Sequence, residues 1–141
     1  MKIFVLKRLF QSIFNHKKLA VQLALLCTAL ILFACFIPSY KVPKVNVPLI
    51  DKWVHFIVFA AFAFTWSMVY KTYSWLKALF IILVAFVLGW LVEVIQGIGL
   101  TIGRSFEVMD IVADGIGGII GAIIFYACYN FWIKSNSKLR T

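Results

Sequence analysis

Four long apolar runs, separated by short polar segments, dominate the pattern of this chain. They cover residues 19–37, 52–70, 78–96 and 108–133. Each run has about the 20 residues that a helix needs to cross the hydrocarbon core of a bilayer. Three prolines between residues 38 and 48 end the first run, because proline cannot continue a helix. The pattern predicts an all-α, four-span transmembrane helical bundle.

Residues 1–18 show a different pattern, in which apolar and basic residues lie on opposite sides of a helix. Lys7, Arg8 and Lys18 mark the basic side. The apolar side is formed by Ile3, Leu6, Leu9, Phe10, Ile13 and Phe14. This predicts a short amphipathic helix in the membrane interface, with its basic side against anionic headgroups. A cleaved signal peptide is disfavoured, because Phe33 does not suit the faint lipoprotein-like box at residues 32–35.

The composition indicates whether the fold is surrounded by water or by lipid. Hydrophobic residues make up 64% of the chain and charged residues only 13%, whereas soluble domains contain roughly 45–50% apolar residues. An integral membrane protein with one compact domain is therefore expected. Cys27, Cys35 and Cys128 fall inside apolar runs and are predicted to be buried rather than disulfide-linked. No phosphate loop, dinucleotide fingerprint or cysteine metal cluster is present, and no cofactor is predicted.

The distribution of Lys and Arg predicts the orientation. With the N-terminus inside, ten basic residues fall on the inner side and four on the outer side, which places both termini and the basic tail at 134–141 in the cytoplasm. The inner group is Lys2, Lys7, Arg8, Lys17, Lys18, Lys71, Lys77, Lys134, Lys138 and Arg140; the outer group is Lys41, Lys44, Lys52 and Arg104. The net charge of +9 is then a topology signal, and no nucleic-acid partner is predicted.

Acidic residues are rare and gather at the predicted outer ends of the spans. Glu93 lies within a span, where facing lipid at the helix centre would cost roughly 2.5–3.5 kcal/mol, so it should face the bundle interior. Asp51 and His55 are four residues apart on one helix face, with Lys52 beside them. Gln96 shares the face of Glu93. These spacings predict one polar pocket at the outer face.

The last span carries small and acidic residues at helical spacing. Asp110, Asp114, Gly117 and Gly121 recur on one face, and the two glycines are predicted to allow close helix packing of the small-xxx-small kind. The glycine-rich segment 97–107 is predicted to leave the helix and fold back against the bundle.

Three hypotheses about this pocket remain open. In an enzyme, Asp51, His55, Glu93 and Asp110 are candidate catalytic acids or bases, and the candidate ligand-binding residues are Lys52, Gln96, Arg104 and Asp114, with the two cations holding a phosphate or carboxylate. A non-catalytic protein could use the same cations to bind a lipid headgroup or an antibiotic. A purely structural network would satisfy these charges internally. A divalent metal could be bound by Asp110, Asp114, Glu93 and His55, but no spacing among them is diagnostic, so no metal site is predicted.

The ordered set of polar residues resembles the VanZ-like family of small bacterial membrane proteins. The matching residues are Asp51, Lys52, His55, Glu93, Gln96, Arg104, Asp110, Gly117 and Gly121. Asp114 departs from the pattern, since the family usually has Asn there. The resemblance implies a multi-pass protein of the bacterial cytoplasmic membrane, and the founding member of the family is associated with teicoplanin resistance. Its implied partners are membrane lipids and either a lipid-linked envelope precursor or a glycopeptide.

Overall fold

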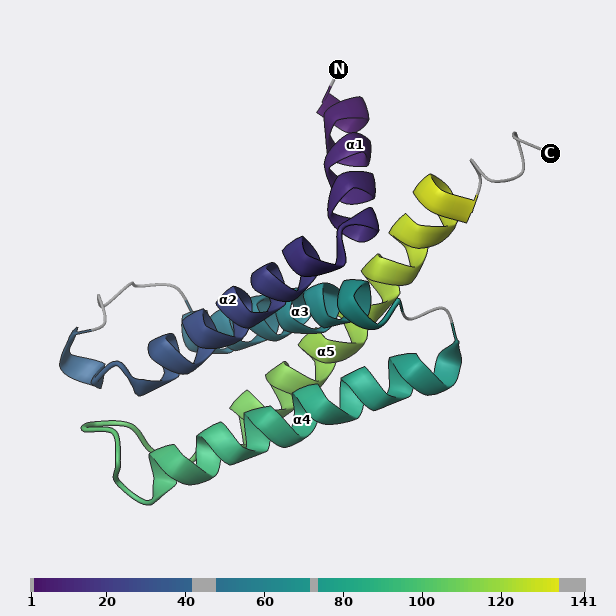
Figure 1. The fold of residues 1–141 in the computed structure, drawn as a ribbon. Coiled ribbons are helices and arrows are strands. Elements are labelled where there is room, and N and C mark those ends of the chain that lie inside the picture. The colour runs from purple at the N-terminus through teal and green to yellow at the C-terminus, as the bar shows by residue number, and fades with distance from the viewer. Residues whose placement is uncertain (1, 42–47, 72–73, 135–141) are drawn as a thin grey trace.

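The computed structural model describes residues 2–41, 48–71 and 74–134 (Figure 1). Every regular element in these residues is helical. They are α1 (Lys2–Asn15), α2 (Lys17–Phe36), a 3-10 turn η1 (Ser39–Lys41), α3 (Ile50–Tyr70), α4 (Trp75–Gly97), α5 (Val108–Tyr129) and a π-helical turn η2 (Asn130–Lys134). Helices α2 to α5 are long and apolar enough to cross a membrane. The predicted all-α, four-span fold is therefore confirmed.

Two helix ends lie three or more residues from the ends of the predicted runs. Helix α4 begins at Trp75 rather than at residue 78, because Ser74 caps it and accepts a hydrogen bond from the Lys77 backbone N–H at 3.4 Å. Regular α-helix in α5 ends at Tyr129, and the chain continues through the π-helical turn η2 to Lys134.

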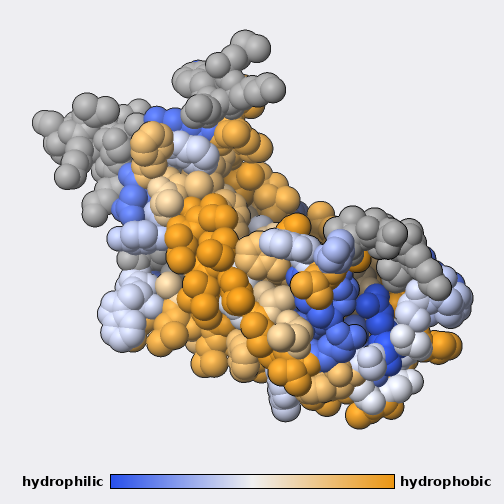
Figure 2. Space-filling model, turned by 180° about the vertical axis from the view of Figure 1, so that it is seen from behind, coloured by the Kyte–Doolittle hydropathy of each residue, from blue (hydrophilic) through white to orange (hydrophobic). Residues whose placement is uncertain are grey.

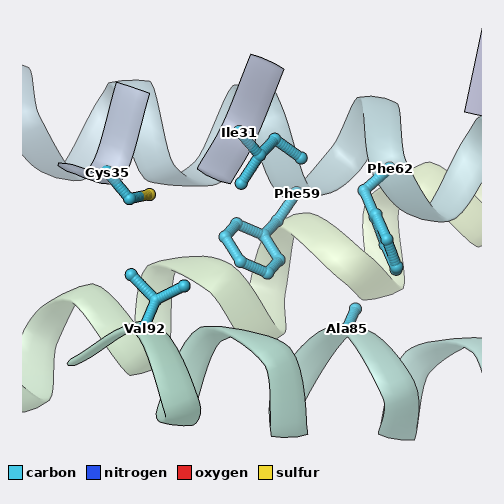
Figure 3. Close-up of a cluster of buried hydrophobic side chains, with 6 residues drawn as sticks. All are labelled: Ile31, Cys35, Phe59, Phe62, Ala85 and Val92. Carbon is cyan, nitrogen blue, oxygen red and sulfur yellow. The ribbon is translucent and has the colours of Figure 1, made fainter. Parts of the chain in front are cut away.

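The core lies between α2, α3 and α4, with α5 packed along α3 and α4. Figure 3 shows one buried cluster to which α2 contributes Ile31 and Cys35, while Phe59 and Val92 come from α3 and α4. Phe59 has no exposed surface. Apolar side chains on the outer sides of the same helices remain exposed, as expected for helices that face lipid.

Glycines bring α3 and α5 close together. A Cβ atom at Gly121 would lie 2.9 Å from the Ala60 carbonyl carbon, and one at Gly117 would lie 3.1 Å from the Ala60 backbone nitrogen. Real Cβ atoms essentially never approach the first of these distances, so a side chain at Gly121 would force the helices apart. The contacts are those that close packing through small residues requires.

The N-terminal segment forms the predicted helix, but part of its apolar side packs on protein. Phe10 and Phe14 are buried against Phe125 in α5. The Gln11 side-chain amide donates a hydrogen bond of 2.8 Å to the Trp132 carbonyl. Helix α1 nevertheless projects at an angle from α2 (Figure 1), and several of its apolar side chains are exposed. Its location in the membrane interface stays a prediction.

The two ends of the bundle differ in chemistry. Helix α1, the end of α3, the start of α4 and η2 lie at one end, whereas η1 and the segment between α4 and α5 lie at the other (Figure 1). At this second end the Ser39 N–H donates to the Ile102 carbonyl at 3.1 Å, and Gly99 and Gly103 have φ angles of +81° and +74°. The segment after α4 is thus non-helical and folds back onto the end of α2. Figure 2 shows hydrophilic residues gathered there beside a hydrophobic flank.

Candidate functional site

The start of α3, the end of α4 and the start of α5 bring the predicted polar residues together. We call His55, Glu93, Asp110 and Asp114 the buried acidic cluster, because each is at most 6% exposed. Three helices contribute to this cluster. In each of them a polar residue lies on the same face as the apolar residues that pack in the core. A separate groove of about 810 Å³ between α1, α2, α3 and α5 is almost wholly apolar and contains none of these four residues.

Lys52 closes the cluster on the side nearest the surface. Its Nζ atom lies 2.6 Å from Asp51 Oδ2 and 2.9 Å from Asp110 Oδ1, and it also bonds to Glu107 Oε2. The side chains of Asp51 and Glu107 are nearly half exposed, whereas that of Asp110 is 9% exposed. One ammonium group is therefore shared by three carboxylates and links α3 to the start of α5.

His55 is held by Asp114 and faces Asp110. Its Nδ1 lies 3.0 Å from Asp114 Oδ1, and its Nε2 lies 3.8 Å from Asp110 Oδ2. A carboxylate only accepts hydrogen bonds, so in the neutral ring Nδ1 carries the hydrogen and Nε2 carries the lone pair. That lone pair faces Asp110. Gly89 in α4 makes room for Asp114, because a Cβ there would lie 2.8 Å from the Asp114 Cβ.

Glu93 connects α4 to the start of α5. Its Oε2 accepts a hydrogen bond of 2.8 Å from the backbone N–H of Glu107, the N-cap residue of α5. The backbone N–H groups at this end of the helix have no intrahelical acceptor, so a buried carboxylate is a suitable partner. Its other oxygen, Oε1, is buried and has no hydrogen-bond partner among the described residues. The Oε1 atom is therefore available to accept a hydrogen bond or to bind a cation.

Gln96 and Arg104 contact the end of α2. The Gln96 Nε2 donates to the Cys35 carbonyl at 2.9 Å, and the Arg104 Nε donates to the Ile37 carbonyl at 3.4 Å. Carbonyls in the last turn of a helix lack intrahelical donors, so both side chains hold the end of α2 in place. Neither side chain has a hydrogen bond or ion pair with the buried acidic cluster among the described residues, although all lie at the same end of the bundle.

Sequence reasoning did not assign roles to Glu107 and Gly89. Glu107 is one of the few acidic residues of the chain, and its position next to the first turn of α5 was the available signal. Gly89 shares one face of α4 with Glu93, which marks it as a contact point. The two α2 carbonyls are backbone atoms, so no side-chain pattern could identify them.

The arrangement can accept protons or hold a cation. His55, Glu93 and Asp110 each offer one ligand atom, and these atoms all lie within 4.8 Å of one another. The residues come from three helices, so their separation in sequence hides their proximity. Asp51, Glu107 and Asp110 form a second group within the same limit, but two of its members are exposed.

Comparison with known proteins identifies the family of the chain. A family model described as VanZ/LLP1 matches residues 3–131, which is most of the chain. The resemblance predicted from the ordered polar residues is thereby confirmed. No curated protein and no solved structure matches the chain.

Proposed function

Since the chain belongs to the VanZ/LLP1 family, we propose that it resides in the bacterial cytoplasmic membrane and acts on a lipid-linked substrate of the cell envelope. The site of action is the polar end of the bundle. The observation that carries the proposal is the convergence of His55, Glu93, Asp110 and Asp114 inside four apolar helices. Ionisable residues within spans are expensive to insert and usually serve a function.

The charge distribution supports an outward-facing site. Lys17 and Lys18 at the start of α2, with Lys71 and Lys77 between α3 and α4, lie at the end opposite the polar cluster. Basic residues mark the cytoplasmic side of membrane proteins, so the polar cluster faces outward. Labelling of single cysteines tests this orientation in a variant lacking the native cysteines. A cysteine at Lys41 should react from outside the cell and one at Lys77 only after permeabilisation; the reverse result contradicts the orientation.

The proposed substrate class rests on Arg104. Lys52 is occupied by three carboxylates, so Arg104 is the better candidate to bind an anionic headgroup. Its guanidinium uses only Nε for a hydrogen bond among the described residues, and the remaining N–H groups form a fork that matches phosphate or carboxylate. The bilayer around the helices supplies the lipid part of the substrate.

The chemistry follows from the lone pairs. Nε2 of His55, together with the Glu93 and Asp110 carboxylates, can take a proton from a water or hydroxyl group as it attacks the headgroup, and can return a proton to the oxygen that leaves when the headgroup bond breaks. Asp114 orients His55 through Nδ1, as carboxylates do in catalytic pairs. Asp51 is more exposed than the buried acidic cluster and is bonded to Lys52. It therefore positions the ammonium group of Lys52 and does not act as a general base.

A second candidate function is binding without catalysis, as in protection against a glycopeptide. The partners of His55 favour this function. They are two carboxylates, and no hydroxyl or thiol nucleophile contacts His55 within the described residues. A protein of this kind would retain the headgroup or antibiotic at Arg104 and leave it unchanged.

Native mass spectrometry of the protein extracted with its own lipids tests the proposed site. Wild type and Lys41→Ala, a control that removes an exposed cation at the same end, should retain a bound anionic lipid. Arg104→Ala should lose it. Equal retention by all three proteins, or no specific lipid on any of them, contradicts the proposal.

A further inference from the structure

We infer that His55, Glu93 and Asp110 form a binding site for one divalent transition-metal ion of the zinc class. The site would use Nε2 of His55 and one oxygen from each carboxylate. Its existence does not depend on the substrate of the protein. It goes beyond the proposed function because it assigns a metal ion to the polar end.

The distances suit a small ion after slight adjustment. The three ligand atoms lie within 4.8 Å of one another, and Nε2 of His55 is 3.8 Å from Asp110 Oδ2. Around a tetrahedral zinc ion with bonds of about 2.0–2.2 Å, neighbouring ligand atoms lie roughly 3.3–3.6 Å apart. Shifts of about an ångström or less would therefore complete the geometry.

A positive charge would stabilise the buried acidic cluster. Glu93, Asp110 and Asp114 are all more than nine-tenths buried. Lys52 contacts only Asp110 among them, and it is shared with two more exposed acids. Glu93 Oε1 and Asp114 Oδ2 are buried without hydrogen-bond partners among the described residues. Buried carboxylates without partners are strongly destabilising, and a bound cation would supply the missing attraction.

Each proposed ligand is anchored through an atom that the ion would not need. Nδ1 of His55 is bonded to Asp114, Oδ1 of Asp110 to Lys52, and Oε2 of Glu93 to the backbone N–H of Glu107. A carboxylate on the second ring nitrogen is the usual support for a metal-binding histidine, because it fixes the tautomer and orients the ring. Nε2 of His55, Oδ2 of Asp110 and Oε1 of Glu93 remain as donor atoms.

The ligand set selects the kind of ion. Ca²⁺ and Mg²⁺ prefer oxygen ligands alone, whereas an imidazole with two carboxylates suits zinc and related divalent ions. Three protein ligands also leave a position for water, as in catalytic zinc sites. With the ion bound, Nε2 of His55 and the two carboxylate oxygens would no longer accept a proton, and the ion itself would activate the attacking water. That consequence rests on the proposed function; the binding site does not.

Zinc titration of metal-stripped protein in detergent tests the inference, with a purification tag that contains no histidine. Wild type should bind about one zinc ion per chain by elemental analysis, and His55→Ala and Glu93→Gln should weaken binding at least tenfold. Glu107→Gln is the matched control, because it removes an exposed carboxylate but keeps the backbone N–H that holds Glu93. It should bind zinc like wild type.

Two results would overturn the inference. One is wild-type protein that binds less than a tenth of an equivalent of zinc at micromolar concentration. The other is loss of binding in Glu107→Gln but not in His55→Ala, which would place the ion in the exposed group of acids. Co²⁺ absorption of wild type provides a measurement without mutation: bands of a four- or five-coordinate ion are expected, and their absence contradicts the site. Zinc binding without lipid binding would leave this inference intact and contradict the proposed substrate.

Discussion

Replacing Lys52 with Met should destabilise the protein far more than replacing any one of its three partners. The ammonium group contacts Asp51, Glu107 and Asp110. Removing it leaves Asp110 charged, 9% exposed and close to the other buried carboxylates. The exposed acids, by contrast, can be solvated when Lys52 is absent.

The magnitude follows from the burial of each pair. Removing one partner of a buried ion pair costs about 3–5 kcal/mol, whereas an exposed pair contributes about 0–1 kcal/mol. We therefore expect Lys52→Met to lower the free energy of unfolding by about 3 kcal/mol or more. Asp51→Asn and Glu107→Gln should each cost less than about 1 kcal/mol. Asp110→Asn should also cost little, since it relieves repulsion within the buried acidic cluster and leaves Lys52 two partners.

Equilibrium unfolding in mixed micelles, followed by tryptophan fluorescence, measures these differences. A double-mutant cycle between Lys52→Met and Asp110→Asn should give a coupling energy of about 2 kcal/mol or more, because the double variant contains no stranded buried charge. If Asp51→Asn costs as much as Lys52→Met, or if the cycle shows no coupling, the assignment of Asp110 as the buried partner is refuted.

Four further variants test the packing of the helices. Gly121→Ala should lower stability by about 1–3 kcal/mol because its Cβ meets the α3 backbone, while Gly115→Ala, whose nearest contact is an ordinary 3.4 Å, should be neutral or gain up to about 1 kcal/mol; equal effects in unfolding assays contradict this. Gly89→Ala should displace the Asp114 carboxylate and weaken zinc binding about 10–100-fold, measured by the same titration, and unchanged affinity would refute the contact. Phe10→Ala should release α1 from the bundle and make it sensitive to limited proteolysis, whereas wild-type resistance would show that α1 does not depend on this contact.

Most of the fold could be predicted from the sequence, because membrane spans are long and their apolar runs contain few charged residues. The helices found over these runs depend only on length and hydropathy. What the sequence could not predict is the partial burial of the N-terminal helix. Phe10 and Phe14 have the same periodicity whether they face lipid or protein, and only the positions of distant aromatic residues such as Phe125 decide between the two.

The convergence of the polar residues could be predicted from the sequence, but the contacts that they make could not. Glu93 and Asp110 stand out because charged residues in apolar spans are rare, so their convergence could be expected. The role of Gln96 could not be predicted, because its partner is a backbone carbonyl of another helix. The sharing of Lys52 among three carboxylates depends on the relative rotation of α3 and α5, which composition does not encode.

The most direct test of the central claim, that the polar end is an active site rather than an internal network, compares wild type with Glu93→Gln. Both proteins are incubated with the cell's own lipid extract, and the masses of the bound lipids are measured by native mass spectrometry. Thermal unfolding of both proteins is recorded in parallel. We predict that the variant folds and retains its lipid, and that only wild type converts that lipid to a species of different mass. A variant that fails to fold, or one that converts lipid as wild type does, would contradict the claim.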